Sequence, residues 1–388
     1  MSMEVCNSSM NFKLLNKDTV VCTFFITTLE YGMSCNVLKI FRKDLMPHDL
    51  RNIQEWIESR YILSYKEGIK SFFNRIGITR LEDFVLVTNC VSLKDTYWVK
   101  GERSKKFWRS VSPYTNSLNK VIADYSFNGK INGKCVTGSP DFATDGNFSK
   151  CWKRVNGVLQ LYKAGSSGAY NAGNEPYSEV YASKIADLMG ISHIEYSLGT
   201  YKSRVISKCN CMCSEDIGFI SYRDYTGEMH ADFSNLLKQF KYNYKILDML
   251  LLDYLLCNVD RHYGNFGFLI NNDTNKIVGL SPIFDNNLSC IPYYMSDENI
   301  EHYIDDIRAK DGRTWSELFR LIDSKYVRTR ISILVGNYRK IRVTKDRDNI
   351  VDRMVRLQLK RIGVNVTVER ITEKSDSEIC VQGSIAKI

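Results

Sequence analysis

Residues 258–285 read NVDRHYGNFGFLINNDTNKIVGLSPIFD, and this stretch decides the fold expected for the chain. The twelve residues before it, ILDMLLLDYLLC at 246–257, are mostly apolar and predict a buried helix. Polar residues begin where that helix should end, an arrangement that holds reactive groups on a rigid support. Asp260 and Asn265 lie five residues apart in a glycine-containing loop, and Asp285 follows an extended apolar segment. We therefore expect these three side chains to converge.

The three side chains suit phosphoryl transfer. That reaction needs a carboxylate that orients or accepts the proton of the attacking hydroxyl, oxygen ligands for Mg²⁺, and a lysine that holds the phosphates. On this interpretation Asp260 is the base, and Asn265 and Asp285 bind Mg²⁺. Protein kinases have the same spacing between base and metal-binding Asn. The residues themselves differ from those of eukaryotic kinases. Asp-Arg-His stands in place of His-Arg-Asp, and Asp285 is followed by Asn286 and Asn287 in place of Phe-Gly.

Several short motifs accompany this pattern. They are Asn258-Val259-Asp260-Arg261-His262, Asn265-Phe266, Pro282-Ile283-Phe284-Asp285, Leu161-Tyr162-Lys163 and Asn174-Glu175-Pro176-Tyr177-Ser178-Glu179. Together they resemble the HipA-like serine/threonine kinases, a bacterial branch of the protein-kinase-like fold that includes toxins. The combination is more specific than any one motif, since an isolated Asp-Arg-His is weak evidence. We take the resemblance to cover residues 142–361.

The resemblance implies an α+β, two-lobed protein-kinase-like fold with a small β-rich N-lobe and a mainly helical C-lobe. We expect a family-specific α+β region at 1–128, the N-lobe at 129–213, the C-lobe with the catalytic segment at 214–372, and a frayed tail at 373–388.

Composition fits a folded protein that stays where it is made. The chain has 388 residues with 44% hydrophobic and 12% aromatic residues, enough for one large or two ordinary cores. It contains no run of eighteen apolar residues, and its first residues lack the charged start and apolar core of a secretory signal. We therefore expect a cytoplasmic protein without a membrane span.

The cysteines and the net charge add little to the prediction of function. Twelve cysteines lack the regular framework of a small secreted domain, so reduced thiols are expected. Cys209, Cys211 and Cys213 alternate as on one face of a strand, and no fourth ligand at zinc-site spacing accompanies them. The net charge of +9 favours polyanions weakly, and ATP is one. Basic residues concentrate at 339–361, where the solvated face of a packing helix and a nucleic-acid surface both remain open.

The N-terminal region shows no chemical constellation. Asp95 and Trp98 resemble a recurrent element of the N-terminal extension in some HipA-like proteins, and we interpret them as structural. Expected elements are a hairpin of strands at 11–29 and 34–41, helices from 46–49 to Ile62 and at 66–76, a strand at 84–91, and a turn with a strand at 92–99.

Residues 142–154 resemble two strands that flank a nucleotide-covering loop. The loop has neither the three glycines of kinases nor a Walker sequence. We assign Thr144 and Gly146 to the nucleotide site, with backbone N–H groups and the side chains of Thr144 and Ser149 contacting phosphate. Thr144 and Ser149 are also candidates for autophosphorylation. An ordinary hairpin explains the local sequence equally well.

Lys163 lies in the predicted strand 158–165, in line with two leucines. A buried ammonium needs an anionic partner, and ATP phosphates and Glu179 are on offer. Glu179 belongs to a helix predicted at 175–189, with Asn174 as its cap and Gly190 closing it. The resemblance implies that Lys163 and Glu179 form the lysine–glutamate pair of kinases. Solvent exposure at the edge of the strand is the alternative for Lys163.

Further strands are expected at 194–198 and 204–209, with the adenine-binding hinge near 208–211. Helices are expected within 233–256 and 296–363, and residues 271–275 form a polar turn between two strands.

Three polar residues around the base have open roles. His262 is interpreted as a support for the loop, with proton transfer as the alternative. Arg261 holds a phosphorylated loop or pairs with an acidic neighbour. Asp253 lies two helical turns before Asp260 and is interpreted as a helix-surface residue.

The sequence and the resemblance together predict an ATP- and Mg²⁺-dependent kinase of Ser/Thr hydroxyls in protein. Autophosphorylation, a toxin role and an antitoxin-type partner are implied by the resemblance alone, and nucleic acid is not required. Two alternatives stay open: a nucleotide-binding pseudokinase or interaction module, and a lipid or small-molecule kinase of related fold.

Overall fold

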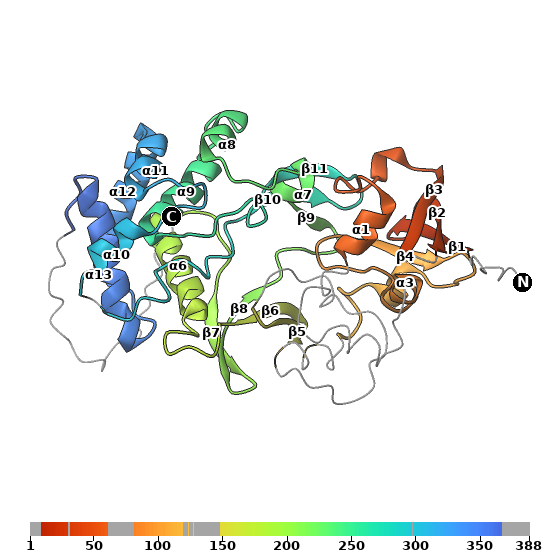
Figure 1. The fold of residues 1–388 in the computed structure, drawn as a ribbon, viewed down its shortest axis with the longest axis horizontal. Helices are drawn as coiled ribbons and strands as arrows, with labels where there is room; N and C mark the ends of the chain where they lie inside the picture. The colour runs from red at the N-terminus through yellow and green to blue at the C-terminus, as the bar shows by residue number, and fades with distance from the viewer. Residues whose placement is uncertain are drawn as a thin grey trace, which may run out of the picture.

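The computed structural model describes residues 9–29, 32–60, 81–118, 123, 127, 148–296 and 298–366. These residues form two four-stranded sheets, one three-stranded sheet and a helical C-terminal part. Figure 1 shows the N-terminal sheet in red and orange at one end of the molecule and the C-terminal helices in blue at the other.

The N-terminal sheet is antiparallel and has the order β3-β2-β1-β4. Its strands are β1 (Ser9–Asn16), β2 (Thr19–Leu29), β3 (Gly32–Ile40) and β4 (Tyr97–Gly101). Phe12 of β1 pairs with Phe24 of β2, and their rings stack with centroids 5.6 Å apart. Alternate residues of β1 and β2, among them Phe12, Leu14, Phe24 and Ile26, are buried and give the region its own core.

Short helices cover this sheet: η1 (Lys43–Leu45), α1 (Ile53–Ser59), α3 (Leu81–Thr88) and α4 (Trp108–Val111). The α1 helix begins after Asn52, whose Oδ1 accepts a hydrogen bond of 2.7 Å from the N–H of Glu55. Trp56 and Ile57 then pack into the core. The expected structural roles of Asp95 and Trp98 agree with their contacts, an ion pair to buried Arg60 and an indole bond of 2.6 Å to the Lys17 carbonyl.

Several expectations for this region are wrong. Residues 11–29 form two strands with a turn at Lys17 and Asp18, where Lys17 has a φ of +48°. The helix expected from residue 46 begins only at Ile53, because Asn52 supplies the cap. Most of the strand expected at 84–91 lies in helix α3, since a short apolar run does not distinguish a buried strand from a buried helix. The helix expected at 66–76 lies outside the described residues.

The second sheet is antiparallel with the order β5-β6-β8-β7. It contains β5 (Lys150–Val155), β6 (Val158–Ala164), β7 (Ser197–Tyr201) and β8 (Arg204–Asn210), so the expected strand at 194–198 is displaced by three residues. Helix α6 (Glu175–Met189) packs against it and ends at Gly190, whose φ of +63° confirms the predicted cap. Asn174 does not cap the helix with its side chain; its Nδ2 donates to the Pro292 carbonyl at 2.9 Å.

The third sheet is antiparallel and has the order β11-β10-β9. It contains β9 (Ile217–Ser221), β10 (Gly267–Asn271) and β11 (Lys276–Leu280), with α7 (Tyr222–Thr226) following β9. A Cβ at Gly267 would lie 2.1 Å from the Ile220 carbonyl oxygen, so this position requires glycine. The predicted polar turn at 271–275 connects β10 and β11.

The C-terminal part is helical and shares one large core with α6. Its helices are α8 (Phe233–Gln239), α9 (Tyr244–Leu256), α10 (Ile300–Asp306), α11 (Trp315–Ile322), α12 (Lys325–Asn337) and α13 (Lys345–Arg361). All residues of α9 from Ile246 to Leu256 are buried, which confirms the predicted buried helix. On α13 the predicted apolar stripe also packs inward, through Ile350, Val351, Met354 and Val355.

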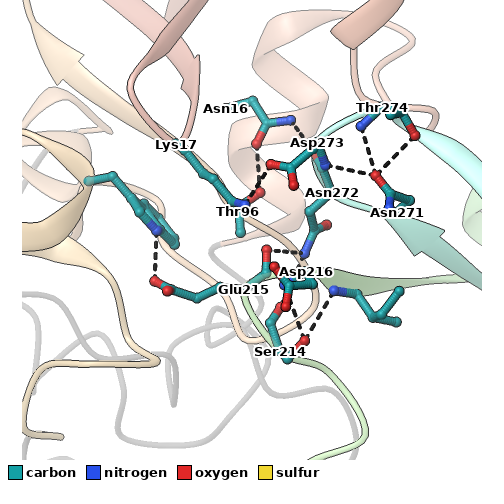
Figure 2. A network of polar contacts seen from close by, with 12 residues as sticks. Asn16, Lys17, Thr96, Ser214, Glu215, Asp216, Asn271, Asn272, Asp273 and Thr274 are labelled. Atoms are coloured by element: carbon teal, nitrogen blue, oxygen red, sulfur yellow. Dashed lines mark hydrogen bonds and ion pairs between the residues drawn. The ribbon is translucent and has the colours of Figure 1, made fainter.

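Polar side chains fasten the N-terminal sheet to the turn at 271–275 (Figure 2). The Nδ2 of Asn16 donates to the Asn272 carbonyl at 2.6 Å, and its Oδ1 accepts from the Thr96 hydroxyl at 2.6 Å. Lys17 pairs with Asp273 at 2.6 Å. The Nδ2 of Asn272 continues the network by donating to the Ser214 and Glu215 carbonyls.

The N-terminal region also holds the segment 211–216 that connects β8 to β9. The carboxylate of Glu215 accepts 2.8 Å and 2.9 Å hydrogen bonds from Trp108 Nε1 and the Ser112 hydroxyl. In the second sheet, Arg154 of β5 donates to the Pro113 carbonyl of the N-terminal region at 2.9 Å. The N-terminal region therefore contacts both the second and the third sheet. The domain boundaries at 128, 213 and 372 stay predictions.

Candidate active site

Helix α9 delivers the polar segment 258–265 from the core. The helix ends at Cys257, which adopts a left-handed conformation with a φ of +50°. The Asn258 N–H then donates to the Asp253 carbonyl at 3.0 Å, and the Asn258 Oδ1 accepts from the Asp260 N–H at 3.1 Å. The segment thus leaves the helix in a hydrogen-bonded turn instead of fraying, as a rigid support for reactive groups requires.

Arg261 is completely buried and ties the segment to its surroundings. Its guanidinium donates to the Asp253 carboxylate at 2.9 Å, the Asn265 carbonyl at 2.9 Å and the Phe284 carbonyl at 2.7 Å. It also donates to Asn286 Oδ1 at 2.6 Å. One side chain therefore connects α9, the 258–265 segment and the residues on both sides of Asp285.

These contacts decide between the two roles left open for Arg261. Burial disfavours its charge, but the Asp253 carboxylate outweighs that effect and raises the pKa of Arg261 above its usual value. Arg261 pairs with an acidic neighbour inside the protein. The interpretation of Asp253 as a helix-surface residue is wrong, because this residue is 1% exposed and accepts from both Arg261 and Asn258.

Lys163 lies between two carboxylates. Its Nζ pairs with Glu179 of α6 and, at 2.6 Å, with Oδ1 of Asp285. The second oxygen of Glu179 accepts from the Asn286 N–H at 2.8 Å, so the glutamate also fixes the backbone next to Asp285. The lysine side chain is 8% exposed, which rules out the solvent-exposed alternative.

Burial and the interactions among Lys163, Glu179 and Asp285 together determine the pKa values of these three groups. Burial disfavours the ammonium of Lys163, but Asp285 and Glu179 outweigh it and raise the pKa of the lysine. Burial likewise opposes ionisation of Asp285, yet Lys163 lowers the pKa of this carboxyl to about 2. Glu179 is dominated by its burial, which raises its pKa despite Lys163. A lysine shared by two acids is thus held charged in the interior.

The backbone of Asp285 has a φ of +57°, in the left-handed region. Non-glycine residues seldom adopt this conformation, although Asp and Asn tolerate it better than others. Such backbone conformations persist where the surroundings impose them, frequently at functional sites. Here the bonds of Arg261 and Glu179 to residues 284 and 286 hold the backbone on either side.

Asp260 and Asn265 face each other across the loop. The Nδ2 of Asn265 donates to the Asp260 carbonyl at 3.0 Å, and its backbone N–H donates to the His262 carbonyl at 2.9 Å. With the amide nitrogen engaged, the amide oxygen of Asn265 is left as an oxygen ligand. The structure thus fixes the side chain of Asn265 through the loop that carries Asp260.

His262 supports the loop, as preferred from the sequence. Its Nδ1 accepts from the Gly264 N–H at 3.0 Å, so in the neutral ring the proton lies on Nε2. Nε2 lies 3.9 Å from Asp260 Oδ2. Burial lowers the pKa of His262, and the nearby Lys310 ammonium adds to this while Asp260 opposes it. A ring that accepts at Nδ1 and carries its proton at Nε2 has no free basic nitrogen.

Lys310 is a site neighbour that sequence reasoning missed. Its Nζ lies 2.6 Å from Oδ1 of Asp260, although the two residues are fifty positions apart. Lys310 belongs to the connection between α10 and α11, where one lysine among many gives no local signal. Only the tertiary structure could identify it.

A cavity of about 330 Å³ opens beside the cluster. Its wall includes Lys163, Asp285, Asn265 and His262, but not Asp260. Three further cations line the cavity: Lys94, Lys150 and Arg223. The rest of the lining is mainly apolar or belongs to the end of β8 and the segment after it: Ser92, Leu93, Trp152, Leu161, Ile194, Tyr196, Cys209, Asn210, Cys211, Met212, Cys213, Phe219, Gly264 and Phe284. A mostly apolar cavity with a few convergent polar groups is typical of a small-molecule site.

The predicted hinge lies at this cavity, since Asn210 and Cys211 are in its wall. The expectation of one strand through all three cysteines is wrong, because β8 ends at Asn210. The Cys211 N–H donates to the Leu159 carbonyl at 2.8 Å, so Cys211 still follows β6. Burial raises the pKa of the Cys209 thiol to about 12.

Two predicted site residues, Thr144 and Gly146, lie outside the described residues. Ser149 is described, and its hydroxyl accepts a 3.0 Å hydrogen bond from Arg204. Within the described part of the chain no group of three or more His, Cys, Asp or Glu side chains is arranged to hold a metal ion. The metal ligands predicted from the sequence, Asn265 and Asp285, are one amide and one carboxylate. No helix among the described residues is long and apolar enough to cross a membrane.

The chain resembles one curated protein in sequence. It is 31% identical over 129 residues to the serine/threonine-protein kinase CtkA of Helicobacter pylori. The match covers 29% of this chain and 39% of that protein, so the chain matches about two fifths of the length of this relative. No protein-family model matches the chain.

Solved structures that resemble the chain include two kinase-like proteins. The crystal structure of the H. pylori proinflammatory kinase CtkA aligns with a TM-score of 0.39 and 18% identity over 54% of this chain and 90% of that one. HipA of Shewanella oneidensis MR-1, solved with HipB and its operator DNA, aligns with a TM-score of 0.50 and 10% identity over 91% of this chain and 98% of that one. The resemblance stated from the sequence is confirmed, and the chain has the kinase-like fold of HipA.

Proposed function

We propose that the protein is a kinase that transfers the γ-phosphoryl group of Mg-ATP to serine or threonine hydroxyls, on itself or on another protein. The observation that carries this proposal is the position of Lys163, between Glu179 and Asp285 in the wall of a cavity that Asn265 also lines. Kinases position ATP phosphates through such a lysine, held by a helix glutamate.

Each residue has a separate task in the proposed transfer. Lys163 binds the phosphates and Glu179 holds Lys163 in place. Asp260 orients the acceptor hydroxyl and takes its proton. The hydroxyl oxygen forms a bond to the γ-phosphorus while the bond from phosphorus to the bridging oxygen breaks, and ADP leaves with that electron pair.

The residues present fit Mg²⁺, which prefers oxygen ligands and, when bound, neutralises charge on the β- and γ-phosphates. Asn265 uses its amide nitrogen for the Asp260 carbonyl, which leaves its Oδ1 as a ligand. Asp285 uses Oδ1 for Lys163, which leaves Oδ2 as a ligand. We assign the metal to Asn265 and Asp285, and phosphate contacts to the loop around Thr144 and Gly146.

The test is phosphorylation with γ-labelled ATP and magnesium. Wild-type protein and Asp260→Asn are compared with Asp306→Asn, a change at an exposed carboxylate of α10. We expect label on the wild type and on Asp306→Asn, none on Asp260→Asn, and an ATP-dependent rise in melting temperature for all three. Full transfer by Asp260→Asn would remove the role assigned to this carboxylate.

Two other functions are separated by the same assay. A nucleotide-binding pseudokinase or interaction module would show the ATP-dependent rise in melting temperature but no transfer to itself or to protein acceptors. The joint presence of Lys163, Glu179, Asp260, Asn265 and Asp285 favours an active enzyme over that class. A lipid or small-molecule kinase would label those acceptors instead of protein.

A regulatory partner belongs to the proposal as well. HipA of S. oneidensis was solved with HipB in a toxin–antitoxin system. By analogy we propose that this chain acts as a toxin or regulator with an antitoxin-type protein partner. Growth arrest on expression of the wild type, and not of Asp260→Asn, is the outcome expected of a toxin whose effect depends on transfer.

A further inference from the structure

The 258–265 segment contains Asp260 but no lysine. Its arginine is turned away from Asp260, because Nε, Nη1 and Nη2 of Arg261 donate to Asp253, Asn265, Phe284 and Asn286. The positive charge beside Asp260 belongs to another segment of the chain. It comes from Lys310, whose Nζ lies 2.6 Å from the Asp260 carboxylate.

Distance alone does not make this ion pair significant. The side chains of Lys310 and Asp260 are 39% and 28% exposed, and an ordinary surface pair contributes little to stability. What separates Lys310 from an ordinary surface lysine is the backbone that presents it. Residues 309–313 form a closed turn, in which the Ala309 N–H donates to the Arg313 carbonyl at 2.9 Å and the Gly312 N–H donates to the Ala309 carbonyl at 2.9 Å.

The turn is anchored on three sides. Ala309 is buried in the helical core. Asp311 accepts a 3.1 Å hydrogen bond from the Phe233 N–H at the start of α8. Arg313 pairs with Asp311 and donates to the Ser234 hydroxyl at 2.5 Å. Lys310 is thus carried by a turn that is fixed to both the core and α8, and it reaches Asp260 from a defined position.

We propose that Lys310 is a second functional cation of this site, which holds the Asp260 carboxylate in position and places positive charge beside the phosphoryl group during transfer. The proposal rests on the kinase function proposed above. A base contacts the hydroxyl at about 3 Å, and that oxygen meets phosphorus at about 3 to 3.5 Å. With Nζ 2.6 Å from Asp260, the ammonium lies within roughly 9 Å of the reacting phosphorus.

The chemistry of phosphoryl transfer makes such a cation useful. Little covalent assistance is required in a loose transition state, so the orientation of the acceptor matters more than the strength of the base. An ammonium that restrains the carboxylate of Asp260 supplies orientation. Its charge also favours the negative charge that spreads over the transferred oxygens, and it adds to the charges of Lys163, Lys94, Lys150 and Arg223 in the cavity wall.

The experiment compares steady-state kinetics of four full-length proteins with the acceptor labelled best by the wild type. Lys310→Met removes the charge and keeps the length, Lys310→Arg keeps the charge, and Arg308→Met removes a neighbouring exposed charge that donates to the Asp305 and Ile307 carbonyls. The readouts are kcat, the KM for ATP and the melting temperature.

We expect Lys310→Met to lower kcat by about 10- to 100-fold. Its KM for ATP should stay within about twofold of the wild type, because Lys163 still binds the phosphates. Lys310→Arg should recover most of kcat, and Arg308→Met should match the wild type. If Lys310→Met is poorly folded, Lys310→Gln provides the second neutral variant.

Several results would overturn the proposal. A Lys310→Met variant with unchanged kcat shows that the ion pair is incidental, and a raised kcat shows that Lys310 restrains the base instead of assisting it. A higher KM with unchanged kcat assigns the lysine to nucleotide binding alone. Equal losses in the Met and Arg variants remove the role of charge. If the wild type transfers no phosphate to any acceptor, the proposed kinase function fails and this inference fails with it.

Discussion

Asp253 and Arg261 form an ion pair behind the site, with 1% and 0% of their surfaces exposed and a distance of 2.9 Å from Nε to Oδ2. Neither residue lines the cavity beside Lys163. The pair joins the end of α9 to the carbonyls of Asn265 and Phe284. Its contribution is to position the 258–265 segment and Asp285 relative to each other.

Removing one partner of this pair should destabilise the fold. In Arg261→Met the Asp253 carboxylate stays buried without its cation, and we expect the free energy of unfolding to fall by about 3 to 5 kcal/mol. Urea denaturation monitored by circular dichroism measures this loss. The control is Arg328→Met, which breaks an exposed pair with Asp323 and should have a much smaller effect. Similar losses in both variants would contradict the special role of Arg261.

Glu179→Gln should separate function from stability. Glutamine keeps an oxygen for the Asn286 N–H but removes the charge that faces Lys163. We expect kcat/KM for ATP to fall about 10- to 100-fold, because Lys163 is then held by Asp285 alone. The melting temperature should stay within a few degrees, since Asp285 still pairs with Lys163 and the glutamine oxygen still accepts from the Asn286 N–H. Glu195→Gln, at an exposed position, is the matched control; wild-type kinetics in Glu179→Gln would refute the expected role.

The carboxyl of Asp285 should make stability depend on pH in the acid range. Its pKa is about 2 in the folded protein and 3.8 as an ordinary value, so the folded state favours the ionised form. The stabilisation is fully present above pH 4 to 5 and disappears as the pH falls towards 2, with an order of 2 kcal/mol in total. The difference in unfolding free energy between wild type and Asp285→Asn should therefore shrink over this window. In a Lys163→Met background the same difference should be small at every pH, and a difference that persists there would exclude Lys163 as the cause.

The contact between the N-terminal sheet and the turn at 271–275 should be measurable as stability. Asn16→Ala leaves the Asn272 carbonyl and the Thr96 hydroxyl without this buried partner. We expect a loss of about 1 to 3 kcal/mol in thermal or urea unfolding. Asn36→Ala removes an exposed asparagine of the same region and should be close to neutral. An equal response of the two variants would mean that the contact contributes nothing.

The fold class was predicted from the resemblance to HipA-like kinases, and several individual elements were predicted from the sequence pattern alone. Helix 175–189, the strand that carries Lys163 and the buried helix before Asn258 all follow from apolar periodicity and cap residues. The burial of Lys163 in line with leucines predicted an anionic partner, and the resemblance to kinases implied that Glu179 is that partner. That these residues catalyse transfer stays a prediction.

Other features depend on tertiary contacts with no local signature. Asp253 lies among leucines on α9, and its burial becomes intelligible only when Arg261 folds back over the helix end. Lys310 lies fifty positions after Asp260 in the sequence. The two side chains meet because the turn at 309–313, which carries Lys310, is fixed to α8. Residues 84–91 were predicted as a strand although most of them lie in helix α3, because Val-rich apolar runs of that length occur in both strands and helices.

The hydrogen bonds from the N-terminal region to Glu215 can couple two binding equilibria. Trp108 and Ser112 hold the segment 211–216, and residues 211–213 of the same segment form part of the cavity wall. A ligand that orders this segment from the cavity side and a protein that orders it from the N-terminal side act on one shared element. Coupling between two binding equilibria is reciprocal. If a bound nucleotide changes the affinity of the N-terminal region for a partner by some factor, binding of that partner changes the affinity for the nucleotide by the same factor.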